Sequence, residues 1–278
     1  MSEATRLALL GPDERTSALH YACERISAVR VDSETFQGVI ACSFDAACSM
    51  AEQGKHVFLA GPCTESEEQA KQLVELCRSR GVTLFVGDLP RNTPACAPML
   101  ARLAEGKLGA PGLLRVHRWR QEKPKAMSDL LGDIDLSLHV FGNAPTEVFA
   151  MQRDDVGYVQ IHLGFPDGGM ALIDYATLPS GRGYDSVCLI GATGAAYADD
   201  HHNSHLLFTG GDPQAWISDS GNGLAKEVEM FVDCMEGNAV PPLGCEDILR
   251  VHRVLDAVQE ALETGGVLRL RGETYERV

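Results

Sequence analysis

The sequence lacks several features that would assign it to a class at once. It has no apolar run approaching the ~18 residues of a membrane-spanning helix, and no Cys-x-x-Cys pair among its nine cysteines. Basic residues are few, since 24 lysines and arginines stand against 39 acidic residues, for a formal net charge of −15. Because phosphate binding needs clustered basic side chains, we expect neither nucleic acid nor a membrane as a partner.

The cysteines also lack the pattern of a disulfide framework. Their number is odd, and most lie in apolar or helical runs, which is typical of reduced thiols in a cytosolic protein. The stretch MSEATRLALLG has an apolar run of only four residues, which is too short for a secretory signal. These observations predict a cytoplasmic protein.

The first part of the chain alternates short apolar strands with helical segments. Strands are predicted at 6–11, 26–31, 38–43, 57–59, 82–87 and 112–119, and helices at 13–25, 44–54, 64–80 and 94–106. Thr64-Glu65-Ser66-Glu67 has the pattern of a capping box. The alternation indicates βαβ units and a parallel sheet with helices on both faces. We therefore expect a Rossmann-like domain over residues 1–120.

The second part has longer, alternating strands. Helices are predicted at 127–141, 223–236 and 245–263, and strands at 156–165, 170–178, 184–191, 194–199 and 206–210. Pro166-Asp167-Gly168-Gly169 is a strong hairpin signal. The predicted fold class is α/β plus α+β: a shortened Rossmann-like parallel sheet, then a domain over 121–278 with a large, mainly antiparallel open sheet. Val159, Ile161, Leu163, Leu172 and Tyr175 are expected on a face of this sheet that a partner covers.

Four strings occur in order along the chain: GKHVFLAGP, RNTPACAPMLARLAEGKLGAPGLLRVHR, LIGATGAAYAD and EVEMFVDCMEGNAVPPLGCEDILRVHRVLDAVQEALETGGVLRL. Together they closely resemble the Gfo/Idh/MocA family of NAD(P)-dependent oxidoreductases, over about residues 38–271. The resemblance implies NAD(P) as the cofactor, sugars or polyols as substrates, and dimers or tetramers formed through the open sheet.

The dinucleotide fingerprint of such domains, G-x-G-x-x-G in the first βα turn, is mostly absent. The turn reads Gly11-Pro12-Asp13-Glu14-Arg15-Thr16, in which an acid replaces the second glycine and would repel a pyrophosphate. That acid would instead stabilise the helix dipole. Asp32 ends the second strand, where a ribose-binding acid would lie, but the chain up to Gly38 is too short for the family's next strand and helix. Gly11 and Asp32 are the candidate residues for NAD(P), if any is bound.

The resemblance also locates the family's catalytic groups, and two of them are replaced. The lysine of its E-K-P motif falls at Gly61, and the histidine of its His-x-x-Asp helix falls at Gly132. The aspartate of that helix is Asp135. Candidates for displaced catalytic groups are Asp135, His139 on the same helical face, and Lys123 in a later Glu-Lys-Pro string. A packed or surface role for His139 and coincidence for Lys123 are the simpler alternatives.

Other candidate sites have a plain structural alternative. Arg91 and Asn92 match the family's turn beside the substrate cleft, although Asn92 could equally start helix 94–106. A basic patch that could bind an anion, or form a solvated linker, consists of Arg118, Arg120, Lys123 and Lys125. The polar run 199–205 has residues that bind divalent metals, but a solvated loop is simpler. We predict no metal site.

These replacements lead to one main hypothesis and two alternatives. The main hypothesis is a degenerate Gfo/Idh/MocA-type protein with weakened or lost NAD(P) binding and hydride transfer. It would bind a sugar-like ligand and act as a homo-oligomer or in complex with an active homologue. The first alternative is an active NAD(P)-dependent oxidoreductase with displaced groups. The second is a cofactor-independent hydrolase or lyase that uses Asp129, Asp133 and Asp135. Whether the chain is an enzyme is left open at this point.

Overall fold

The computed structural model describes residues 4–61, 64–122, 127–155, 157–177, 183–199, 204–209, 214–217 and 223–278. It divides into two compact units. Unit 1 comprises Met1–Leu89 with Gly221–His252, and unit 2 comprises Pro90–Ser220 with Arg253–Val278. No helix in these described ranges is both long and apolar enough to cross a membrane.

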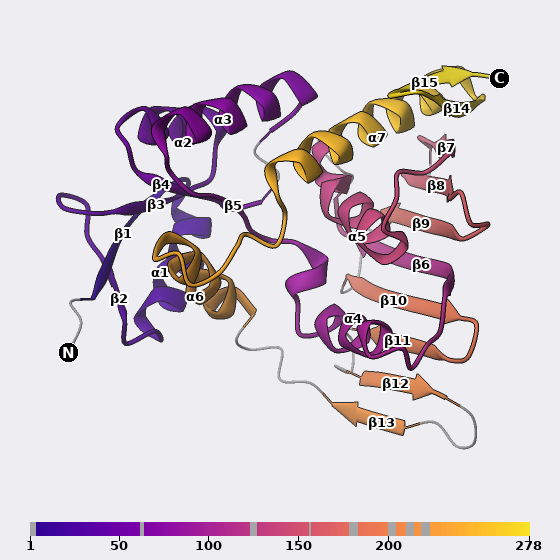
Figure 1. Cartoon of the computed structure of the whole chain (residues 1–278), viewed down its shortest axis with the longest axis horizontal. Coiled ribbons are helices and arrows are strands. Elements are labelled where there is room, and N and C mark those ends of the chain that lie inside the picture. The colour runs from indigo at the N-terminus through magenta and orange to yellow at the C-terminus, as the bar shows by residue number, and fades with distance from the viewer. Residues whose placement is uncertain are drawn as a thin grey trace. The chain divides into compact units, whose positions relative to one another are not determined.

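The units do not follow the sequence division at residue 120. Strand β6 (Pro111–Arg120) pairs within the second sheet, and helix α6 (Gly223–Met235) returns to unit 1 (Figure 1). The reason for the return is hydrophobic burial, because the apolar side of α6 is part of the core of unit 1. Helix α7 (Cys245–Thr264) begins in unit 1 and ends in unit 2.

Unit 1 is built on a five-stranded, all-parallel sheet with the order β2-β1-β3-β4-β5. Its elements are β1 (Thr5–Leu10), α1 (Asp13–Glu24), β2 (Val29–Val31), β3 (Gly38–Ala41), α2 (Phe44–Glu52), β4 (His56–Leu59), α3 (Glu67–Arg80) and β5 (Leu84–Val86). The predicted strands and helices are confirmed. Helix α3 begins later than expected, because Ser66 rather than Thr64 is its N-cap and accepts the N–H of Gln69.

Helices cover both faces of this sheet, α2 and α3 on one and α1 and α6 on the other (Figure 1). On the second face the rings of Phe58, Phe85 and Phe231 contact one another, with centroids 5.0 to 5.9 Å apart. Gly87 is required beside them, because a Cβ there would lie 2.3 Å from the Phe58 ring. The core of unit 1 is thus shared between the first part of the chain and α6.

Thr64 has a different role from the predicted cap. Its hydroxyl lies 2.9 Å from Nε2 of His252, a fully buried histidine of α7. Burial lowers the pKa of His252 to about 4, although the nearby charge of Glu67 acts in the opposite direction. His252 is therefore neutral in the folded protein at pH 7 and joins α7 to the start of α3.

The buried His252 should make stability depend on pH. Its folded pKa of about 4 lies below the unfolded value, so protons favour the unfolded chain as the pH falls. Its contribution is complete above the unfolded pKa of about 6.5, and about 3 kcal/mol is lost by about pH 4. Urea unfolding of the wild type and of His252→Gln, each above pH 6.5 and at about pH 4, tests this. The free energy of unfolding lost on acidification should be about 3 kcal/mol smaller in the variant. Equal losses in the two proteins would contradict a buried, neutral His252.

Unit 2 is built on a ten-stranded sheet with the order β13-β12-β11-β10-β6-β9-β8-β7-β14-β15. Besides β6, its strands are β7 (Glu147–Arg153), β8 (Tyr158–Gly164), β9 (Met170–Thr177), β10 (Tyr184–Gly191), β11 (Ala195–Asp199), β12 (Ser204–Phe208), β13 (Gln214–Ile217), β14 (Val267–Arg271) and β15 (Thr274–Arg277). All pairs are antiparallel except β6 with β9. The predicted open sheet is confirmed, and β7, β13, β14 and β15 extend it beyond the expected strands.

Helices lie against one face of the sheet of unit 2 (Figure 1). They are η1 (Pro90–Asn92), α4 (Cys96–Ala104), η2 (Met127–Leu130), α5 (Leu131–Phe141) and the second part of α7. Tyr175 faces α5 and η2, and Ile161 and Leu163 are buried. These side chains were expected on the open face, and that expectation is wrong because they form the core under the helices. The open face instead carries Trp119, Met151, Met170, Ile190, Phe208 and Val267, all exposed.

Candidate functional site

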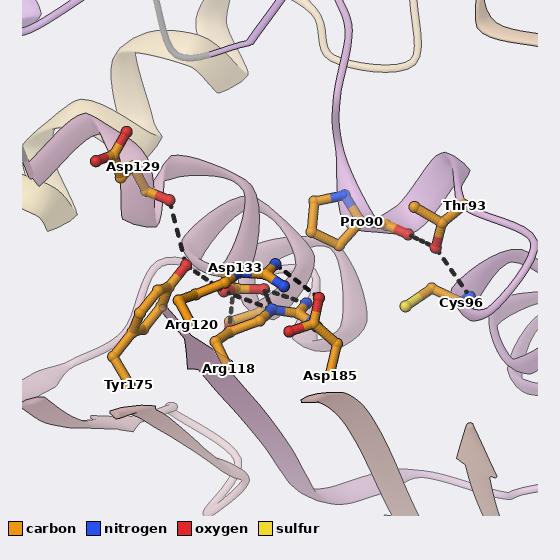
Figure 2. Close-up of polar contacts among 10 residues, drawn as sticks. Pro90, Thr93, Cys96, Arg118, Arg120, Asp129, Asp133, Tyr175 and Asp185 are labelled. Carbon is orange, nitrogen blue, oxygen red and sulfur yellow. Dashed lines mark hydrogen bonds and ion pairs between the residues drawn. The ribbon is translucent and has the colours of Figure 1, made fainter. Parts of the chain in front are cut away.

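A buried ion-pair network joins the start of α5 to the sheet of unit 2, and we call it the Arg118 network. Arg118 of β6 donates through Nε and Nη2 to both oxygens of Asp133, at 2.6 to 3.2 Å (Figure 2). The Tyr175 hydroxyl donates to Asp133 at 3.3 Å, and Asp185 of β10 lies near Arg118 and pairs with Arg120 at 2.6 Å. Asp133 therefore joins the first turn of α5 to β6 and β9, and Asp185 of β10 pairs with the arginines of β6.

The surroundings of this network keep Arg118 charged and Tyr175 neutral. Burial by itself would lower the pKa of Arg118, but the charge of Asp133 and its hydrogen bonds outweigh burial and raise it. Burial, and then the charge of Asp133, raise the pKa of Tyr175, which stays a neutral donor. Asp133 is only 2% exposed. It is a buried structural carboxylate whose oxygens are bonded to Arg118 and Tyr175.

The Arg118 network corrects the expected basic patch. Arg118 is buried and paired with Asp133, and Arg120 is paired with Asp185, so neither presents an uncompensated charge. Lys123 and Lys125 lie outside the described residues. The alternation of Leu114, Val116 and Arg118 along β6 is a signal that could have placed the arginine on the inner face, beside a carboxylate.

A second network, the Arg91 network, comprises Arg91, Asp135 and His139. Arg91 of η1 is 9% exposed, and its Nε lies 2.9 Å from Oδ2 of the buried Asp135. Its Nη1 lies 3.1 Å from Nδ1 of His139. The structure thus brings together three of the residues that the sequence singled out. They form an ion pair and a hydrogen bond within unit 2.

The contact with Arg91 fixes the tautomer of His139. A guanidinium can only donate, so Nδ1 of His139 accepts and the ring proton of the neutral imidazole lies on Nε2. A general base needs a free nitrogen lone pair to take a proton. In this arrangement Nδ1 is already engaged, although the side chain itself is exposed. His139 is held as a hydrogen-bond acceptor for Arg91.

Asn92 and Thr93 start the α4 region in a way that the sequence only partly predicts. The Thr93 hydroxyl donates to the carbonyl of Pro90 at 2.6 Å and accepts the N–H of Cys96 at 3.2 Å (Figure 2). Helix α4 therefore begins at Cys96, not at Pro94. Thr93, rather than Asn92, makes these two contacts. The predicted substrate role of Asn92 stays a prediction.

The residues that follow β4, Ala60 and Gly61, carry no side chain that could act in catalysis, as the sequence indicates. Ala60 is buried, and Gly61 adopts a left-handed φ of 89°, which favours glycine over a long side chain. Lys123, the candidate replacement for the missing lysine, lies outside the described residues. So do residues 200–203 of the polar run. Among the residues that are described, no group of three or more acidic, histidine or cysteine side chains could hold a metal ion.

The two candidate NAD(P) residues have clear structural partners. A Cβ on Gly11 would lie 2.5 Å from Sγ of Cys42. Asp32 accepts the N–H groups of Glu34 and Thr35 at 2.8 and 3.0 Å, and the hydroxyl of Thr35 at 3.0 Å. These bonds, that of the Thr35 N–H first, lower the pKa of Asp32. The residues at this edge thus do not match the pattern that holds a dinucleotide.

A parallel-sheet unit joined to a large open sheet is the two-part architecture of a dehydrogenase of the kind that the motifs suggested. No protein-family model matches the chain. The chain is 26% identical to "Uncharacterized oxidoreductase YrbE" of Bacillus subtilis, over 77% of its own length and 71% of that protein. It is 25% identical to D-xylose 1-dehydrogenase (NADP(+)) 2 of Haloferax volcanii, over 79% of its length and 74% of that protein.

Solved structures share the fold over nearly the whole chain. A putative myo-inositol dehydrogenase from Sinorhizobium meliloti superposes with a TM-score of 0.81 at 17% identity, covering 96% of this chain and all of that one. Aldose–aldose oxidoreductase from Caulobacter crescentus superposes with a TM-score of 0.82 at 15% identity, covering 97% of this chain and all of that one. The relatives and the solved structures are named as dehydrogenases and oxidoreductases, and they support the resemblance to the Gfo/Idh/MocA family that the motifs predicted.

Proposed function

We propose that this protein binds a sugar- or polyol-like ligand on the Gfo/Idh/MocA scaffold, with weakened or lost NAD(P) binding and without hydride transfer. The observation that carries the proposal is the state of α5. Its carboxylates Asp133 and Asp135 are both buried and paired with arginines, and Nδ1 of His139 is engaged by Arg91. With Gly61 at the position of the family's lysine, the groups that the family uses for hydride transfer are either replaced or engaged in these contacts.

The sugar-like class of ligand is supported by the relatives, whose names refer to xylose and inositol. The same names favour the first alternative, an active NAD(P)-dependent oxidoreductase with displaced groups. That alternative would use Lys123, Asp135 or His139, and two of these three are held in the Arg91 network. The hydrolase or lyase alternative loses support, because it needs Asp133 and Asp135 to exchange protons.

Ligand binding tests the proposal directly. Melting curves of the full chain with myo-inositol or D-xylose should shift upward, by about 2.7 kcal/mol of added stability at a concentration of 100 times the dissociation constant. Asn92→Ala should weaken this shift, since Asn92 is the predicted substrate residue outside the buried ion pairs. No shift with any sugar or polyol would refute a sugar-binding role.

We also propose that the open face of unit 2 contacts another protein chain, either a second copy or an active homologue. The face is rich in aromatic and apolar side chains, which is typical of interface cores. At its centre Asp174 is satisfied by His117 at 2.9 Å, Tyr158 at 3.0 Å and Gln160 at 2.7 Å. Sedimentation velocity of the purified chain distinguishes the two partners, because a homo-oligomer forms alone and a hetero-complex does not.

A further inference from the structure

We propose that unit 1 does not accept a nicotinamide dinucleotide, because its own side chains and a short loop take up the place of the cofactor. In an open α/β sheet, ligands bind at the switch point, between neighbouring strands whose connections leave toward opposite faces. Here these strands are β1 and β3, since α1 lies on one face and α2 on the other (Figure 1). This inference rests on the proposed function and deepens it, by assigning the loss of the cofactor to particular residues.

Cys42 fills the switch point. Gly11 follows β1 and Cys42 follows β3, and a Cβ on Gly11 would lie 2.5 Å from Sγ and 2.6 Å from Cβ of Cys42. The glycine therefore permits the close approach of a thiol. In a dinucleotide site the first glycine of this turn serves the tight turn, and the second permits the close approach of the pyrophosphate. Here Cys42 packs against the first glycine, and Asp13 takes the place of the second.

The first turn of α1 also departs from a phosphate site. Its N-cap is Pro12, which removes one of the four unbonded backbone N–H groups of the helix start, and no side chain caps the helix. Phosphates bind helix N-termini through such backbone N–H groups. Thr16, in the place of the third glycine, donates both its N–H and its hydroxyl to the Pro12 carbonyl, at 3.0 and 3.2 Å. The first of these is the opening hydrogen bond of the helix, and the hydroxyl adds a second bond to the same carbonyl.

The adenosine side of the sheet is truncated. The sheet order β2-β1-β3-β4-β5 lacks a strand outside β2 in the described residues, whereas the dinucleotide-binding order has one. Leu7 of β1 pairs with Val31 at the end of β2 and with Gly38 at the start of β3. Residues 32–37 therefore pass from one side of β1 to the other at the level of Leu7. Asp32 follows Val31 and thus lies roughly 10 Å short of Gly11, at about 3.3 Å per residue of strand.

The crossing loop is held in this position by polar contacts. Asp32 accepts three hydrogen bonds from Glu34 and Thr35, and Arg6 donates to the Thr35 hydroxyl at 2.6 Å. Lys55 donates to the carbonyl of Phe36 at 2.7 Å. Asp32 is thus a turn residue whose carboxylate already accepts three hydrogen bonds within its own loop.

The test combines a titration with a pair of substitutions in the full chain. NADH and NADPH are titrated calorimetrically into the wild type, and no saturable binding is expected at millimolar cofactor. Gly11→Ala should lower the melting temperature by roughly 5 °C, because its Cβ meets Cys42. In a Cys42→Gly background the same substitution should change the melting temperature little, as expected for two residues in direct contact.

Micromolar binding of either cofactor to the wild type would overturn the inference. So would a Gly11→Ala effect that is absent, or that persists undiminished in the Cys42→Gly background, because Cys42 would then not fill the switch point. Cofactor binding without turnover would overturn this inference and the loss of NAD(P) binding, and would leave sugar binding and the absence of hydride transfer standing. Failure to bind any sugar would refute the sugar-binding role and leave this inference standing.

Discussion

Replacing Asp133 by alanine is expected to lower the free energy of unfolding by about 3–5 kcal/mol, because it leaves a buried guanidinium without its main partner. Arg118 is 6% exposed, and its other acid, Asp185, lies 3.7 Å away and already pairs with Arg120. Tyr175 also loses an acceptor. Urea unfolding of wild type and variant at neutral pH measures the difference.

A matched control is Asp155→Ala, which removes another arginine–aspartate pair. Arg153 and Asp155 are joined at 2.6 Å, but both side chains are more than 60% exposed. Exposed pairs contribute at most about 1 kcal/mol. If Asp133→Ala lost as little stability as Asp155→Ala, the pairing of Asp133 with Arg118 would not be structural. Asp133 would then again be a candidate for acid–base chemistry.

Phe231→Ala is expected to lower the free energy of unfolding by about 3–5 kcal/mol, as a large-to-small change in a packed core. Phe231 comes from α6, late in the chain, yet its ring packs against Phe58 and Phe85 of the first sheet. Its side chain is fully buried. The loss would show that α6 belongs energetically to unit 1.

Tyr21→Ala serves as the control for Phe231→Ala, because Tyr21 is an aromatic residue of unit 1 that points outward from α1. It is 61% exposed, and it contacts Arg25, the C-cap residue of α1. Its removal should cost under about 1 kcal/mol. A Phe231→Ala variant as stable as Tyr21→Ala would mean that α6 does not complete the core of unit 1.

The sequence predicted the fold well because its signals are local. Apolar runs such as Val57–Leu59, and helix ends such as Gly81 and Gly142 in left-handed conformation, mark elements without reference to the rest of the chain. The missed strand β7 has alternating burial, but its sequence EVFAMQR has few β-branched residues. The placement of α6 in unit 1 depends on contacts more than a hundred residues apart and has no local signal.

The candidate site was only partly predictable for the same reason. Arg91, Asp135 and His139 were singled out separately, and the structure brings them into one network. Because these three side chains contact one another, they are not available for the catalytic and substrate-binding roles that the sequence suggested. Asp32 was placed at a strand end by counting residues, but the pairing of Val31 with Leu7 shows how far that end lies from the tip of β1. Register between strands cannot be read from spacing alone.

The central claim is that the scaffold of the family is retained without hydride transfer, and a single-turnover assay tests it most directly. A stoichiometric amount of protein is mixed with NAD or NADP and a polyol such as myo-inositol, or a sugar such as D-xylose, and reduced nicotinamide is followed by its absorbance. We expect no reduced cofactor above that of a protein-free sample. Formation of reduced nicotinamide in proportion to the protein added would contradict the account and identify an active dehydrogenase.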